Sequence, residues 1–110
     1  MGSLKRGDVV TIAGGGGDYG SKPRPAIVMQ SDLFSALDSL TVLPITGHLA
    51  DAALFRINLE PTEENGISRL SQVMVDKIMP VRRARIDEVI GVIDRKLMKK
   101  LEVAVTVFLG

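Results

Sequence analysis

Arg24 is the residue of this sequence best suited to handle a negatively charged group. It lies between Pro23 and Pro25, and proline rings fix φ at about −65°, which favours an extended backbone held at a defined place. A guanidinium is charged at any biological pH and presents a planar fork of donors, so it can bind a phosphate or stabilise charge that develops on one. An ordinary surface arginine at the start of a strand is the competing interpretation.

Thr46 and His48 follow a predicted strand and are two further candidates for chemistry. Thr46 precedes Gly47, so its hydroxyl could point into a cleft or could only satisfy the local backbone in a turn. His48 is the single histidine, and imidazole titrates near neutral pH, which suits an acid or a base. If the strand continues through residue 48, residues 46 and 48 share a face. A histidine beside a loop with no catalytic part is the alternative.

The glycine-rich stretch over residues 14–22 indicates a surface loop. It matches a dinucleotide-binding pattern and nearly matches a phosphate-binding loop. Both motifs need a helix directly after the glycines, because the free N–H groups at the helix N-terminus bind the phosphate. Here prolines and a predicted strand follow instead, so we exclude a nucleotide cofactor. Tyr19 is the aromatic residue best placed to stack on a base, and Ser21 and Lys22 lie beside it in the same stretch. We therefore predict that Tyr19, Ser21 and Lys22 contact a nucleic acid.

The net charge of +1 hides an uneven distribution. Residues 31–68 carry one basic and six acidic side chains, whereas residues 69–100 carry nine basic and four acidic ones. A folded domain could thus present a basic face to a polyanion, although chance segregation of solvated charges is an equal alternative. We predict a basic groove lined by Arg24 and by some of a later cluster of cations, namely Lys77, Arg82, Arg83 and Arg85.

Length and composition limit the possible chemistry. The 110 residues contain no Cys and one His, which excludes disulfides, Cys-ligated zinc, thiol nucleophiles and two-histidine sites. We expect no metal and no cofactor. The length fits one domain over residues 1–110 that buries about two-thirds of its unfolded surface. Residues 1–3 resemble a remnant of cloning, so we expect the fold to begin at about residue 4 or 5.

The pattern of apolar residues predicts a mainly β fold with two helices. Strands are predicted over residues 8–13, 26–29, 40–45, 54–59, 67–70, 73–81 and 89–93, with a turn at 61–66. A short helix is predicted over 31–37 and a long one over 94–109, with Asp94 as its cap. The valines at 103, 105 and 107 would also suit a strand. The prediction is about six or seven strands in a half-open barrel or pair of sheets.

Five segments, in this order and spacing, resemble the MazF/PemK/Kid toxins of bacterial toxin-antitoxin modules. They are KRGDVV at 5–10, RPAIV at 24–28 after the glycine-rich loop, PIT at 44–46, SQV at 71–73 and the final FLG at 108–110. The resemblance extends over nearly the whole chain. These toxins are the endoribonuclease branch of a fold shared with CcdB.

The resemblance implies an SH3-like small β-barrel that forms a homodimer and cuts single-stranded RNA at a short sequence without a metal. In the family an arginine and a threonine carry the activity, and they fall on Arg24 and Thr46. The RNA 2′-hydroxyl attacks the adjacent phosphate, which leaves a 2′,3′-cyclic phosphate and a 5′-hydroxyl. The loop at 14–22 corresponds to a loop that helps to hold substrate, and a cognate antitoxin covers the same groove. His48, which is not a general feature of the family, could supply a base.

Two other functions stay open from the sequence. One is a CcdB-like gyrase poison. The gyrase-poison determinant of that branch lies at a C-terminus that contains Trp, and this chain has no Trp, which argues against this function. The other is a small barrel that binds RNA without cutting it. The N-terminus lacks an apolar signal segment, and no apolar run approaches the roughly 18 residues needed to span a bilayer, so we expect a cytoplasmic protein with no membrane partner.

Overall fold

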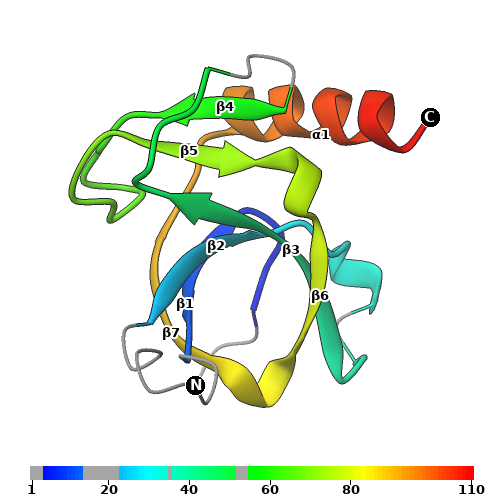
Figure 1. Cartoon of the computed structure of the whole chain (residues 1–110). Coiled ribbons are helices and arrows are strands. Elements are labelled where there is room, and N and C mark those ends of the chain that lie inside the picture. Colours follow the sequence, from blue (N-terminus) through cyan, green and yellow to red (C-terminus); the bar gives the residue numbers. More distant parts are fainter. Residues whose placement is uncertain (1–3, 14–22, 35, 52–54) are drawn as a thin grey trace.

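The computed structural model of the chain describes residues 4–13, 23–34, 36–51 and 55–110 (Figure 1). The predicted RNA contacts Tyr19, Ser21 and Lys22 lie outside these residues. The elements in chain order are β1 (Asp8–Ile12), β2 (Arg24–Val28), η1 (Asp32–Phe34), β3 (Ser39–Thr46), β4 (Arg56–Leu59), β5 (Ser71–Met74), η2 (Val75–Lys77), β6 (Met79–Arg82), η3 (Arg83–Arg85), β7 (Ile86–Val92) and α1 (Arg95–Leu109).

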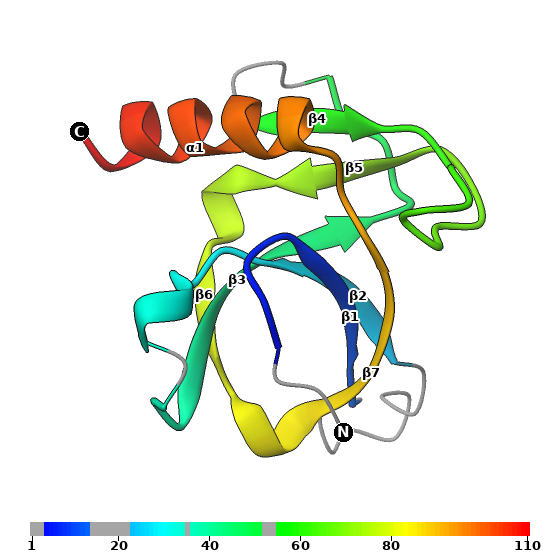
Figure 2. The same ribbon diagram turned by 180° about the vertical axis from the view of Figure 1, so that it is seen from behind.

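The seven strands form one antiparallel, strongly curled sheet, in which six follow the order β4-β5-β3-β2-β1-β7 and the seventh, β6, pairs with β3 off this path. β3 is its central strand and exchanges partners along its length. Its first half, Ser39 to Val42, pairs with β6, and its last residues, Ile45 and Thr46, pair with β5. Within the described residues no pairing joins β6 to β7, so the sheet stays open (Figures 1 and 2). The predicted mainly β fold with a half-open barrel and a C-terminal helix is confirmed.

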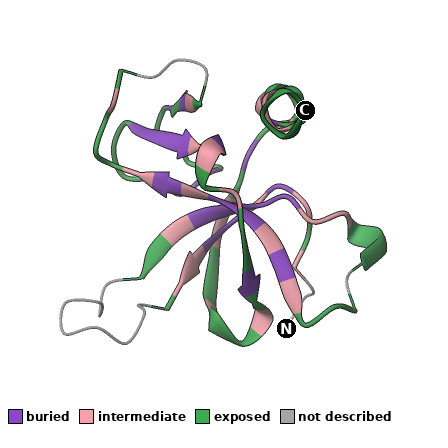
Figure 3. Ribbon diagram, turned by 45° about the vertical axis from the view of Figure 1, so that its right-hand side comes forward, coloured by how far each residue is buried: buried purple, intermediate pink, exposed green. Residues whose placement is uncertain are grey.

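Side-chain alternation along the central strands builds two separate cores. Leu43 and Ile45 of β3 face a core that lies under α1, whereas Leu40 and Val42 face a core inside the curl. The first core includes Leu101, the one fully buried residue of α1. Figure 3 shows the buried residues gathered along the strands, while most of α1 is exposed. Because both faces of β3 are buried, its register is strongly specified.

α1 begins as its sequence predicts. The carboxylate of Asp94 accepts a 2.7 Å hydrogen bond from the backbone N–H of Leu97, which is an N-cap interaction. The valines at 103, 105 and 107 are helical, because packing of Leu101 against the sheet outweighs their β propensity. No helix among the described residues is long and apolar enough to cross a membrane.

Three predicted elements differ from the structure. Residues 67–70 are irregular rather than a strand, and the short helix at 31–37 is reduced to the single turn η1. The predicted strand at 73–81 is divided by η2, where Val75 is buried and Asp76 pairs with Arg56 at 3.0 Å. This corner is needed because β5 and β6 pair with different halves of β3. The predicted turn at 61–66 is present, and Gly66 adopts φ of +69° there.

Candidate nucleic-acid site

Arg24 and Thr46 fall in one row when the register of β2 and β3 is continued two residues past its last pair. The paired positions are Val28 with Val42, Ile27 with Leu43 and Ala26 with Pro44, and this register continued by two residues places Arg24 opposite Thr46. Directly opposed residues of antiparallel strands have their side chains on the same face. Arg24 is exposed, and its backbone is fixed by pairing with Ile12 of β1. The two residues singled out by the sequence therefore share one end of the sheet.

The same row continues through Gln72 of β5 to Asn58 of β4. Thr46 is paired with Gln72, and Gln72 with Asn58. The buried carboxamide of Gln72 accepts a 2.9 Å hydrogen bond from the backbone N–H of Ala50 and donates one of 3.0 Å to its carbonyl. It also donates to the side-chain oxygen of Asn58 at 3.2 Å. Gln72 thus holds the segment that directly follows Thr46.

The hydroxyl of Thr46 has a defined position, and within the described residues its proton makes no hydrogen bond. Its oxygen accepts a 3.0 Å hydrogen bond from the backbone N–H of His48, which is the turn interaction considered from the sequence. A hydroxyl has one donor and two acceptor sites, so this bond leaves the O–H available to donate to a phosphate oxygen. The hydrogen bond from His48 thus holds the Thr46 side chain in place, and the Thr46 hydroxyl can still donate its own proton.

His48 does not continue the strand. β3 ends at Thr46, and residues 47 and 48 form a bend in which the His48 side chain is exposed. The condition under which residues 46 and 48 would share a strand face is therefore not met. Among the described residues, His48 meets Thr46 through its main chain.

A hollow of about 260 Å³ opens beside this end of the sheet. Its lining includes Pro25 and Gly47, the immediate neighbours of Arg24 and Thr46, together with Ser68 and Arg69. Pro25 is on the opposite face of β2 from Arg24, since successive residues of a strand alternate. The hollow therefore lies at the same end of the sheet as Arg24 and Thr46, but on the opposite face from their side chains.

The later cluster of cations does not gather at this site. Lys77 is in η2, which packs against α1, and Arg82 pairs with Ser39 at the opposite end of β3 from Thr46. The Arg83 guanidinium donates at 2.9 Å to the carbonyl of Leu37 at that same end. The prediction was that some of the four cations line a groove with Arg24. These three do not lie at its end of the sheet, because β6 pairs with the first half of β3 and η2 packs against α1.

Arg85 is the member of the cluster that lies nearest to Arg24. Its guanidinium donates at 3.1 Å to the carbonyl of Ala13, and the preceding residue, Ile12, is paired with Arg24. Arg85 therefore contributes positive charge at this end while anchoring the end of β1.

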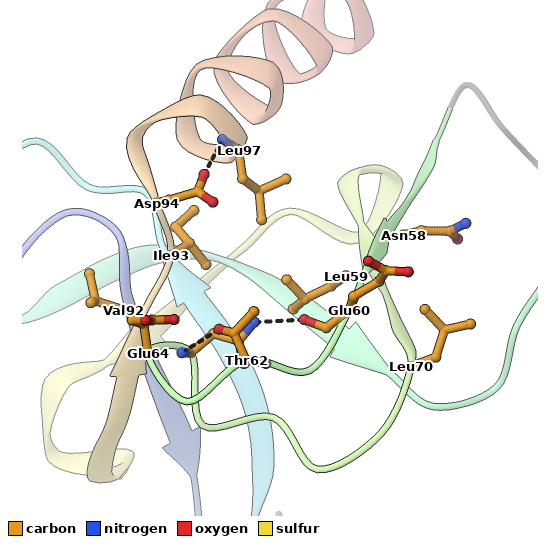
Figure 4. Close-up of a pocket in the computed structure, with 11 residues that line it drawn as sticks. Asn58, Leu59, Glu60, Thr62, Glu64, Leu70, Val92, Ile93, Asp94 and Leu97 are labelled. Atoms are coloured by element: carbon orange, nitrogen blue, oxygen red, sulfur yellow. Dashed lines mark hydrogen bonds between the residues drawn. The ribbon is translucent and has the colours of Figure 1, made fainter.

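A larger hollow of about 520 Å³ lies elsewhere, between the loop after β4 and the start of α1 (Figure 4). Its rim carries the carboxylates of Glu60, Glu64 and Asp94, and the figure shows them around a floor of leucine and isoleucine side chains. Carboxylates repel phosphate groups, so this larger hollow is a poor candidate for a polyanion site. No cluster of acidic or histidine side chains within the described residues could hold a metal ion.

Two residues of the site were not identified from the sequence as functional. Gln72 belongs to the quoted SQV segment, but its side-chain contact with Ala50 depends on tertiary structure. Arg69 stands between Ser68 and Leu70 with no neighbouring cation, so no spacing signal distinguished it. Its position against Gly47 is visible only in the folded chain.

Comparison with known proteins gives one consistent result. A sequence profile described as "PemK-like, MazF-like toxin of type II toxin-antitoxin system" matches residues 5–109. The chain is 40% identical over 107 residues to a probable endoribonuclease MazF of Mycolicibacterium smegmatis, and the alignment covers 97% of each protein.

Similar solved structures have the same fold at low sequence identity. A MazE-MazF structure from Deinococcus radiodurans has a TM-score of 0.80 at 19% identity, with 99% of this chain and 98% of that chain covered. The Mycobacterium tuberculosis toxin MazF-mt6 has a TM-score of 0.76 at 18% identity, with 93% and 95% covered.

Proposed function

Because this chain belongs to the PemK-like, MazF-like toxin family of type II toxin-antitoxin systems and is an endoribonuclease of that family, we propose that Arg24 and Thr46 form its cleavage site. The observation that carries the proposal is the register of β2 and β3, which continued by two residues sets Arg24 opposite Thr46. The substrate is single-stranded RNA, cut at a short preferred sequence without a metal.

In the proposed reaction the RNA supplies its own nucleophile. The 2′-oxygen bonds to the adjacent phosphorus and the bond from phosphorus to the 5′-oxygen breaks. The 2′-hydroxyl loses its proton and the 5′-oxygen gains one, so the products are a 2′,3′-cyclic phosphate and a 5′-hydroxyl. The Arg24 guanidinium stabilises the extra negative charge of the five-coordinate phosphorus, which is the kind of electrostatic contribution that is usually largest in catalysis.

Thr46 orients the reacting phosphate rather than taking its proton. A threonine hydroxyl is a poor base because it is not ionised at neutral pH and its neutral oxygen has little affinity for a proton. Its oxygen is held by the His48 N–H, so its own proton can be directed at a phosphate oxygen. Arg24 and Thr46 would then bind the same phosphate from adjacent strands.

We also propose that the protein acts in the cytoplasm as a homodimer that a cognate antitoxin inhibits. Exposed apolar side chains along α1 support an association surface, since Val103, Val107 and Leu109 are 59%, 73% and 66% exposed. Such a patch is typical of a protein interface. Light scattering should give the mass of two chains.

The test is cleavage of a mixed-sequence RNA in the presence of EDTA, with sequencing of the new 5′ ends. We expect a recurring short motif, 5′-hydroxyl ends that a kinase can label, and cyclic phosphate on the other fragment. Arg24→Ala should lose at least about 100-fold in rate, with its melting temperature unchanged because Arg24 is exposed. Full activity in Arg24→Ala would remove the site assignment. Binding without cleavage would favour a non-catalytic RNA-binding module, and inhibition of gyrase instead would favour a CcdB-like poison.

A further inference from the structure

Thr11 of β1 carries a buried hydroxyl that the described part of the protein does not use. Its side-chain oxygen is shielded from solvent and has no hydrogen-bond partner among the described residues. An unpaired buried polar group costs free energy, so native proteins pair nearly all such groups, and an exception has to be explained. A partner that arrives with a ligand would explain the unpaired hydroxyl.

The same threonine lines the hollow of about 260 Å³ at the Arg24 and Thr46 end of the sheet. Thr11 is paired with Pro25, and the register of β2 and β3, continued by one residue, sets Pro25 opposite Ile45. Opposed residues of antiparallel strands have their side chains on the same face, so these three residues form the floor of the hollow. A rotation of about 120° about χ1 turns the hydroxyl around Cβ without moving the backbone.

The size and lining of the hollow fit one nucleobase. Its walls include the apolar side chains of Ile67 and Ile90, and no carboxylate is among its described lining residues. Its volume is below the roughly 300–1,000 Å³ of sites for drug-sized ligands, so it suits a single planar ring system. Unstacked bases of single-stranded RNA pack their rings against side chains and present donors and acceptors at their edges. A hydroxyl can donate to such an edge or accept from it.

The hollow lies within one residue of the proposed cleavage site. Pro25 and Gly47 line it and directly follow Arg24 and Thr46, and consecutive Cα atoms are about 3.8 Å apart. The Arg24 and Thr46 side chains are on one face of the sheet end, and the hollow is on the other. A nucleotide strand whose phosphate contacts Arg24 and Thr46 can therefore place a neighbouring base around the end of the sheet.

We propose that this hollow binds one of the two bases that flank the cut bond, and that the Thr11 hydroxyl hydrogen-bonds to the edge of that base. Thr11 thereby sets the preferred cleavage sequence at one position. The hydroxyl gains in the complex the partner that it lacks in the free protein, and a base without a matching polar group leaves it unpaired. The proposal rests on the proposed function, since it assumes that RNA is cut at Arg24 and Thr46.

The test is the cleavage preference of Thr11→Val, which replaces the hydroxyl by a methyl group of similar size. Sequencing the fragment ends from a randomised RNA gives the base preference at every position of the motif. Thr11→Val should weaken the preference at one flanking position by about tenfold, as expected for one hydrogen bond, and keep the others. Thr11→Ser should retain the wild-type motif. The melting temperature of Thr11→Val should not fall, because the lost hydroxyl has no partner in the free protein.

The matched control is Thr41→Val, which makes the same exchange in the half of β3 that pairs with β6, where Thr41 is opposite Pro80. Its motif should equal that of the wild type. An unchanged motif in Thr11→Val, or an equal loss of rate at every sequence, would overturn the proposal and leave the cleavage site intact. Failure of the wild-type protein to cut RNA at all would instead defeat the proposed function, so the two failures are distinguishable.

Discussion

The side-chain oxygen of Thr46 accepts a 3.0 Å hydrogen bond from the backbone N–H of His48. This bond spans the bend at Gly47 where β3 ends. It means that residue 48 supports the candidate site through its main chain, while its imidazole is exposed to solvent. The position of the Thr46 hydroxyl and the shape of the following segment are therefore coupled.

Two substitutions at Thr46 should distinguish the contribution of its hydroxyl to cleavage from the contribution of its methyl group. Thr46→Ser keeps the oxygen that accepts the His48 N–H, so we expect cleavage within about threefold of wild type. Thr46→Ala removes both the acceptor and the donor to the phosphate, and the rate should fall by about 100-fold. Single-turnover cleavage of a fluorescent RNA measures both. Equal activity in the two variants would show that the hydroxyl has no part in the reaction.

Two substitutions at His48 distinguish its imidazole from its main chain. His48→Ala keeps the N–H that Thr46 accepts, so its rate should stay within about threefold of wild type. His48→Pro removes that N–H and should lower the rate by about tenfold, the effect of losing one positioning hydrogen bond. A large loss in His48→Ala, with a changed pH profile, would instead assign the imidazole a catalytic part.

Local patterns were sufficient to predict most elements of the fold. Alternating apolar residues located β1 and β3, and the cap at Asp94 with the spacing of Leu97 and Leu101 located α1. The division of residues 73–81 was not predictable, because it depends on β3 exchanging one partner for another. Apolar character alone cannot distinguish one long buried strand from two shorter ones around a corner.

The candidate site was predictable only in part. Arg24 and Thr46 were chosen from their chemistry and from a family resemblance. The pairing of β2 with β3 ends at Ala26 and Pro44, and continuing its register by two residues sets Arg24 opposite Thr46. The cations at 77, 82 and 83 were misplaced because charge spacing along the chain does not show which end of β3 a strand will reach. The position of Arg69 beside Gly47 had no sequence signal, since it arises only in the folded chain.

Gln72 should be needed for stability because it is buried and fully bonded. Gln72→Glu can still accept from the Ala50 N–H, but it places a carboxylate against the acceptor oxygens of Ala50 and Asn58. We expect a loss of about 1–3 kcal/mol in the free energy of unfolding. Urea denaturation measures this quantity. Glu88→Gln is the control, since it makes the reverse exchange at an exposed side chain and should cost less than about 1 kcal/mol. Similar stabilities would show that the Gln72 contacts are dispensable.

Gly66 offers the sharpest test of the close packing between the loop after β4 and β7. It adopts φ of +69°, and a Cβ there would lie 2.2 Å from the carbonyl oxygen of Ile90. A backbone oxygen cannot move aside as a flexible side chain can, so Gly66→Ala combines strain with a clash and should cost more than about 3 kcal/mol in unfolding free energy.

Gly110 provides the matched control for this substitution. It also has positive φ, of +86°, but no atom of the described residues lies within 4 Å of a Cβ built on it. Gly110→Ala should therefore cost less than about 1 kcal/mol, since only the backbone preference is affected and the chain end can relax. Thermal or urea unfolding of the two variants measures the difference. Equal stabilities would mean that contact with Ile90 is not what requires glycine at residue 66.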